Sequence, residues 1–208
     1  MSNPARERIL GRIGKALQQK LPPLDVEQRP IFAPIGDLVE RFQIECKANL
    51  TELVFTRNTA DTCHQLGEIL AVLDPGVIFA DDSVEVRSRL GGYKGAIAWS
   101  SEGRAPEASV ATVTRVEALI AATGSLLVST VSGGRGGSII APVHIALSRR
   151  DQLVPDIEAA LTLAEERGLP EKTSFSGVIT GCSRTADIEK LLVIGAHGPK
   201  RLIVIVED

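Results

Sequence analysis

The stretch RLIVIV, residues 201–206, decides the fold class of this chain. Five apolar residues follow one another in its last five positions, 202–206, whereas a strand with one face in water alternates apolar and polar residues. An unbroken apolar strand is typical of a parallel sheet that is covered on both faces. We therefore expect this segment to be a buried strand of an α/β domain.

Working outward from this strand, the chain alternates short apolar runs with helical patterns. The clearest helix is PDIEAALTLAEERGLP, residues 155–170. Pro155 is favourable in its first turn, and Gly168 and Pro170 end it. Further helices are expected at 35–50, 59–73 and, from a capping-box spacing, 114–122. Strands are expected at 51–56, 76–80, 95–99, 108–113, 125–130, 143–148 and 175–180. This alternation predicts an α/β fold with a parallel-rich sheet sandwiched by helices.

The amino-terminal part of the chain has a different character. Residues 3–20 have the spacing of an amphipathic helix, with Ile9 and Ile13 on its apolar face. Four prolines follow before residue 35 and forbid a continuous helix, so we expect an extended linker there. The sequence thus predicts an arm of helix and proline-rich linker at 1–34 and an α/β domain at 35–208.

Composition narrows the classes of protein to which the chain belongs. It has 208 residues, 44% of them hydrophobic and 24% charged, and a net charge of -3, which lacks the basic surface that nucleic-acid binding needs. We expect no membrane span, no signal peptide and a cytoplasmic location. The cysteines, Cys46, Cys63 and Cys182, are scattered, so we expect buried thiols rather than disulfides or an iron–sulfur cluster, and no cofactor.

The segment SRTAD, residues 183–187, is the first candidate site. If a helix begins there, Ser183 caps it and Asp187 lies in its first turn, where negative charge suits the helix dipole. Arg184 is then a cation at the positive end of the helix, which a bound anion would explain. A simple cap and an anion site formed by Ser183, Arg184 and Thr185 both fit the sequence.

The glycine-rich loop SGGRGGS, residues 132–138, is the second candidate. Gly134 and Gly136 flank Arg135 and allow backbone amides to approach an anionic ligand. The spacing is that of neither a nucleotide-binding P-loop nor a dinucleotide fingerprint. The alternative is an ordinary surface loop.

Two histidines complete the candidates. His144 shares a strand face with small residues and could act as an acid or base, or it could simply be hydrogen-bonded in the strand. His197 would lie at the far end of the sheet from Ser183 if a full helix separated them. A shorter helix followed by a hairpin, or a pocket shared between subunits, would change that placement. No pair of these residues has metal-ligand spacing, and we expect no metal.

Several of these segments together resemble the lactate-utilization protein C family, whose proteins are also called LUD-domain proteins. The resemblance rests on ATGSLLV at 122–128, the glycine–arginine loop with APVHI at 141–145, SRTADIE at 183–189 and GAHGP at 195–199. The family's usual proline is replaced by Cys182, and the glutamate of its Glu-Thr-Gly motif by Ala122.

The resemblance implies both a fold and a role. The fold would be similar to the sugar-phosphate isomerase and CoA-transferase superfamily. The role would be that of an accessory or substrate-handling subunit in the oxidation of lactate to pyruvate, beside iron–sulfur partner proteins. A homo-oligomer is also allowed. The alternatives are a stand-alone enzyme of the isomerase or CoA-transferase type, or a non-catalytic assembly or regulatory protein.

The resemblance also favours a site over a simple cap. A small carboxylate or phosphate would be held by Arg135, Ser183 and Arg184, with His144 or Asp187 as the catalytic acid or base. This geometry requires 125–130 to form a hairpin with 143–148 and to run parallel to 175–180.

Overall fold

The computed structural model describes residues 4–18, 33–134, 136–186, 192–195 and 197–208. The chain divides into two compact units, Met1–Ala33 and Pro34–Asp208. In the first unit, helix α1 spans Pro4–Leu17, and none of its side chains is buried. The part of the chain that the structure describes contains no helix long and apolar enough to cross a membrane.

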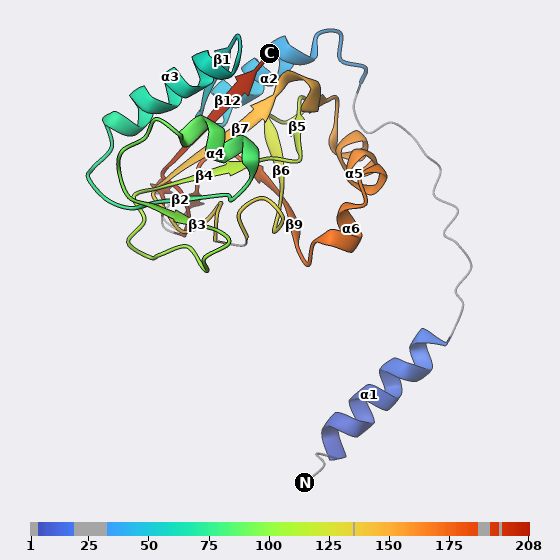
Figure 1. The fold of residues 1–208 in the computed structure, drawn as a ribbon. Coiled ribbons are helices and arrows are strands. Elements are labelled where there is room, and N and C mark those ends of the chain that lie inside the picture. The colour runs from blue at the N-terminus through green and yellow to red at the C-terminus, as the bar shows by residue number, and fades with distance from the viewer. Residues whose placement is uncertain (1–3, 19–32, 135, 187–191, 196) are drawn as a thin grey trace. The chain divides into compact units, whose positions relative to one another are not determined.

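The second unit is built on a six-stranded sheet (Figure 1). The strands, in spatial order, are β1 (Thr51–Thr56), β12 (Arg201–Glu207), β7 (Val143–Arg149), β4 (Ala111–Arg115), β2 (Ile78–Ala80) and β3 (Ile97–Trp99). Every neighbouring pair is parallel. The prediction from residues 202–206 is confirmed, because all five side chains are buried in β12, between β1 and β7.

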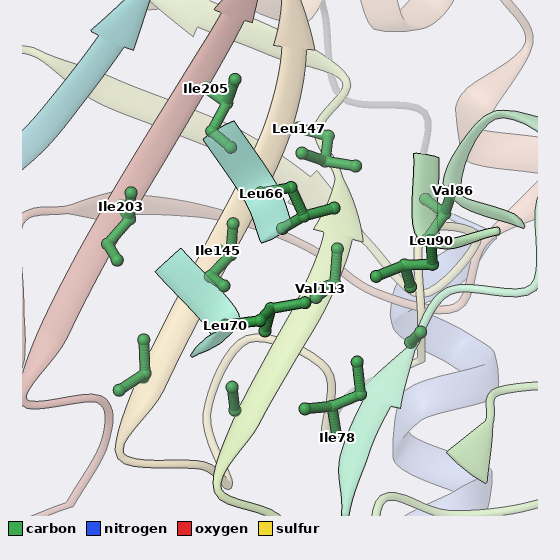
Figure 2. Close-up of a cluster of buried hydrophobic side chains, with 13 residues drawn as sticks. Leu66, Leu70, Ile78, Val86, Leu90, Val113, Ile145, Leu147, Ile203 and Ile205 are labelled. Atoms are coloured by element: carbon green, nitrogen blue, oxygen red, sulfur yellow. The ribbon is translucent and has the colours of Figure 1, made fainter. Parts of the chain in front are cut away.

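Helices cover one face of this sheet. Helix α3 (Thr59–Ala71) begins at the cap Asn58, and helix α4 (Val84–Leu90) begins at the cap Ser83. Leu66 and Leu70 of α3 pack with Val86 and Leu90 of α4 against the sheet residues facing them, including Ile203 (Figure 2). This cluster is the largest of the three buried clusters.

The opposite face of the sheet contacts helix α2 (Leu38–Ala48) and a second sheet. The second sheet has the order β8 (Leu153–Val154), β5 (Ala118–Ile120), β6 (Ser125–Ser129) and β9 (Ser176–Thr180). Phe42 of α2 and Leu126 of β6 share a buried cluster with Leu202, Val204 and Val206 of β12. Helices α5 (Ile157–Glu166) and α6 (Leu169–Lys172) cover the outer face of the second sheet. The predicted α/β architecture is therefore confirmed, with an additional sheet between helix layers.

Two local predictions are wrong. The helix expected at 114–122 is instead the end of β4 followed by β5, because Val116, Leu119 and Ala121 are buried against the first sheet. The expected hairpin of 125–130 with 143–148 does not form, since β6 and β7 belong to different sheets. A single 3-10 turn, η1 (Arg150–Gln152), follows β7.

Candidate functional site

Ser183 lies in a hairpin rather than at the start of a helix. Residues Arg184–Ala186 form strand β10, which pairs antiparallel with β11 (Leu192–Ile194). The amide of Ser183 donates to the carbonyl of Pro199 (2.8 Å), and its carbonyl accepts from the amide of Gly195 (2.8 Å). The helix expected after Ser183 is therefore wrong at 184–186, because backbone groups from the 195–199 segment bind Ser183 instead. Asp187, proposed as an acid or base, lies outside the described residues.

The same hairpin is anchored at the amino ends of two core strands. The amides of Lys200 and Arg201 both donate to the carbonyl of Pro142, at 2.8 and 3.1 Å. Pro142 directly precedes β7, and Arg201 begins β12. The segments at 183–186 and 195–199 are thus joined by backbone hydrogen bonds, and the residues directly after 199 bind the segment at 141–145.

Asn49, the residue that caps the carboxyl end of α2, connects the fourth segment to this edge. Its amide nitrogen donates to the carbonyl of Thr123 (2.9 Å), while its amide oxygen accepts from the guanidinium of Arg184 (3.3 Å). Gly181 approaches so closely that a Cβ there would lie 2.3 Å from the carbonyl oxygen of Asn49. Ala122 is buried, so the position of the family's glutamate offers no carboxylate. Nothing in the local sequence distinguishes Asn49 from an ordinary helix cap.

Ser183 and His197 line a common pocket of about 360 Å³. Strand β9 forms one wall, Gly198 and Pro199 border it, and Ser138 and Ile139 reach it from the end of the glycine-rich loop. His197 is exposed, and Gly198 packs so closely that a Cβ would lie 3.2 Å from the Cβ of Ser183. The sequence leaves the placement of His197 open; in the structure it lies beside Ser183, because the hairpin brings the chain back to that residue.

The glycine-rich loop is packed against the core at its glycines. A Cβ at Gly133 or Gly137 would lie 3.0 Å from a methyl carbon of Thr114. Gly134 and Gly136 line a neighbouring cavity of about 580 Å³ rather than the Ser183 pocket, and Ile139 borders both. Arg135 lies outside the described residues.

The expected alignment of the loop with Ser183 is also corrected. Strand β6 runs antiparallel to β9, with Ser129 opposite Ser176 and Ser125 opposite Thr180. The glycine-rich loop therefore leaves β6 at the end opposite to the one where β9 leads into Ser183. Among the described residues, Ser138 at the end of the loop and Ile139 after it line the Ser183 pocket.

His144 is fully buried within β7 and is not among the described residues that line the Ser183 pocket. Its Nε2 shares a hydrogen bond of 2.8 Å with the hydroxyl of Thr114, whereas its Nδ1 has no partner among the described residues. Burial lowers the pKa of His144 from 6.5 to about 4, because the interior disfavours the charged ring. At neutral pH it is an uncharged imidazole beneath the glycine-rich loop.

The remaining reactive groups offer no metal site. Among the described residues, no group of three or more His, Cys, Asp or Glu side chains could hold a metal ion. Cys46 and Cys182 are buried as expected, but Cys63 is half-buried. Burial, assisted by the charge of Glu45, raises the pKa of the Cys46 thiol to about 12, so it is unreactive.

Comparisons with known proteins identify relatives of this chain. Residues 104–206 match the LUD domain, a range that contains the residues lining the Ser183 pocket and all of β12 except Glu207. Proteins named Lactate utilization protein C from Macrococcus caseolyticus and Anoxybacillus flavithermus are each 26% identical to this chain; the alignments cover 96% of it and 94% and 96% of those proteins.

A solved structure shares the fold. The crystal structure of a DUF162 family protein from Deinococcus radiodurans aligns with a TM-score of 0.62 at 16% identity, covering 82% of this chain and 96% of that one. The sequence match over 104–206 and the near full-length relatives lead to one conclusion. This chain carries a LUD domain at residues 104–206 and is similar over nearly its whole length to proteins named Lactate utilization protein C.

Proposed function

We propose that this protein serves in lactate utilization, in the cytoplasm, as an accessory or substrate-handling subunit that binds a small anion in the Ser183–His197 pocket. The observation that carries the proposal is the meeting of the four family segments around one hairpin. The relatives' name supplies the metabolic context. Three scattered cysteines cannot hold a cluster, so the electrons of lactate oxidation would pass to iron–sulfur partner proteins.

The chemistry of the pocket suits a carboxylate or phosphate. Ser183 contributes a half-buried hydroxyl, and His197 contributes a ring nitrogen from the same pocket. Arg184 lies exposed one residue further on and, among the described residues, has one hydrogen bond, to Asn49. Its guanidinium can therefore turn toward an anion at little cost, and such charge-assisted hydrogen bonds are the strong ones. Proton transfer by His144 or Asp187 remains a prediction.

Thermal-shift and calorimetric titrations with lactate, pyruvate and phosphate test the site. We expect lactate to stabilise the wild type, and His197→Asn and Ser183→Ala to lose that stabilisation. His64→Asn is the matched control, because His64 is also exposed but lies on α3, outside the pocket. Equal stabilisation in His197→Asn, Ser183→Ala and His64→Asn would remove the pocket from the proposal.

A further inference from the structure

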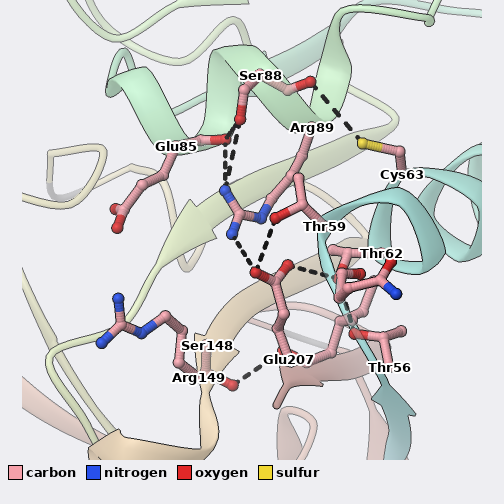
Figure 3. A network of polar contacts seen from close by, with 12 residues as sticks. Thr56, Thr59, Thr62, Cys63, Glu85, Ser88, Arg89, Ser148, Arg149 and Glu207 are labelled. Carbon is pink, nitrogen blue, oxygen red and sulfur yellow. Dashed lines mark hydrogen bonds and ion pairs between the residues drawn. The ribbon is translucent and has the colours of Figure 1, made fainter.

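A separate cleft opens at the carboxyl ends of the parallel strands. Arg115 ends β4, Arg149 ends β7 and Glu207 ends β12, so parallel pairing brings all three to one edge of the sheet. Figure 3 shows Arg149 and Glu207 at this edge. Ligands of open α/β sheets bind at this edge. The Ser183 hairpin is anchored at the other end of β7, about 20 Å away for a strand of this length.

The cleft has a volume of about 240 Å³ and strongly charged walls. Four guanidiniums line it, those of Arg89, Arg115, Arg149 and Arg167. Three carboxylates also line it, those of Glu85, Glu117 and Asp151. A chain with a net charge of -3 thus gathers cations from four separate elements around one small space.

The back of the cleft is held by a buried network. Glu207 accepts hydrogen bonds from Thr59 (3.0 Å), Thr62 (2.7 Å) and Arg89 (2.9 Å), and Arg89 also donates to the backbone carbonyl of Glu85 (3.1 Å) (Figure 3). Burial opposes the charge on Glu207, but the bonds from Thr62, Thr59 and Arg89 hold its pKa below the ordinary value. Glu207 therefore fixes the position of Arg89, which lines the cleft.

Arg115 is fixed in the same way at the side of the cleft. Its Nε contacts Asp81 at 2.6 Å, and a terminal nitrogen lies 3.5 Å from Glu85. Asp81 is buried, whereas the side chain of Arg115 is 33% exposed. This places a positioned guanidinium at the opening.

Glu117 presents a carboxylate across from these cations. One of its oxygens, Oε1, accepts from the hydroxyls of Ser129 and Ser132, both at 2.6 Å. Its backbone carbonyl accepts from the exposed Arg167 (3.1 Å), which holds that guanidinium over the cleft. Among the described residues, both side-chain hydrogen bonds of Glu117 fall on Oε1, which leaves Oε2 without a hydrogen bond.

Arg149 is the member that a ligand could recruit most readily. It pairs with Asp151, and both side chains are more than half exposed, at 54% and 59%. Exposed ion pairs of this kind are weak because water screens them, so exchange of Asp151 for a bound oxyanion costs little.

From this arrangement we propose that the cleft binds a small hydroxylated oxyanion, independently of the Ser183 pocket. Arg149 and Arg167 hold the anionic group in charge-assisted hydrogen bonds. Glu117 accepts a hydrogen bond from a hydroxyl group of the ligand. An anion without hydroxyl groups would pair with the guanidiniums but would offer no hydrogen-bond donor to the three carboxylates that line the cleft. We therefore expect the ligand to carry hydroxyl groups.

Calorimetric titration of the full chain tests the assignment. The probes are glycerol 3-phosphate, glycerate and inorganic phosphate, so the first two share hydroxyls and differ in the anion, while the third has no carbon-bound hydroxyl. We expect a hydroxylated probe to bind best, and the stronger of the first two identifies the anion. Arg149→Gln and Arg167→Gln should each raise the Kd about tenfold or more. Glu117→Gln should remove the preference for hydroxylated probes.

Arg150→Gln is the matched control. Arg150 is 52% exposed, pairs with Asp208 at 2.7 Å and lies over the ring of Phe55, away from the cleft. The Arg150→Gln variant should bind the probes with the Kd of the wild type. His197→Asn should do the same, because the Ser183 pocket lies at the opposite ends of the strands. Absence of binding to the wild type, or equal Kd values for Arg149→Gln, Arg167→Gln and Arg150→Gln, would overturn the proposal. Loss of binding in His197→Asn would assign the probes to the Ser183 pocket and overturn it as well.

Discussion

Two threonines on β4 differ in whether their hydroxyl group forms a hydrogen bond with His144. Thr112 and Thr114 are both buried on the same face of β4, but only Thr114 bonds the ring of His144; the Thr112 hydroxyl has no partner among the described residues. Thr114→Val should lower the free energy of unfolding by about 1–3 kcal/mol, because it leaves a buried ring nitrogen without its partner. Urea denaturation measures this loss.

Thr112→Val is the control for that experiment. Valine has nearly the shape of threonine and removes a hydroxyl that is already unpaired, so this variant should be neutral or more stable. Equal losses in the two variants would mean that the bond between Thr114 and His144 contributes nothing to stability.

The buried ring of His144 also predicts a pH dependence of folding. Its pKa is lowered from 6.5 to about 4 by burial, so between these values the unfolded chain binds more protons than the folded one. Stability should therefore fall as the pH drops from 6.5 toward 4, with a contribution approaching about 1.4 kcal/mol per pH unit. His144→Gln should flatten that part of the profile. Parallel wild-type and His144→Gln profiles would contradict the neutral, buried imidazole.

At the scale of single elements, prediction from sequence succeeds where burial leaves a continuous pattern. The strand at 202–206 and the helices beginning near 59 and 155 are confirmed. The spacing of the apolar residues in each of them matches the face that the element buries. The segment at 114–122 has the spacing of a capping box, but a capping box stabilises a helix less than the burial of Val116 and Leu119 stabilises the strands. The segment therefore forms strands.

The hairpin at Ser183 could not be predicted for a different reason. Its backbone partner, Pro199, lies sixteen positions along the chain, and no local pattern records that bond. Sequence motifs identified Ser183 and His197 separately, but only the hairpin brings them to one pocket. Arg149 was missed although it follows a buried apolar strand, which is the pattern expected of a residue at the ligand-binding edge.

At the scale of the whole molecule, the described residues of the three core clusters all belong to the α/β domain, from Ile35 onward. The amino-terminal helix α1, in contrast, exposes a stripe of large apolar side chains. They are Ile9, Leu10, Ile13 and Leu17. We propose residues 1–34 as an arm that recruits partner proteins through this stripe.

Deletion of residues 1–34 separates folding from recruitment. The truncated chain should unfold at nearly the same temperature as the wild type, because its core clusters are intact. Co-expression with the iron–sulfur proteins expected of the same lactate system, followed by affinity purification and iron analysis, measures recruitment. We expect iron to co-purify with the full chain and to be lost on deletion.

In the full chain, Ile9→Asp with Ile13→Asp should reproduce that loss, since both side chains are about half exposed on α1, at 55% and 49%. Arg57→Gln, a surface change on the domain, should retain iron; retention by the truncated chain would place recruitment on the domain instead.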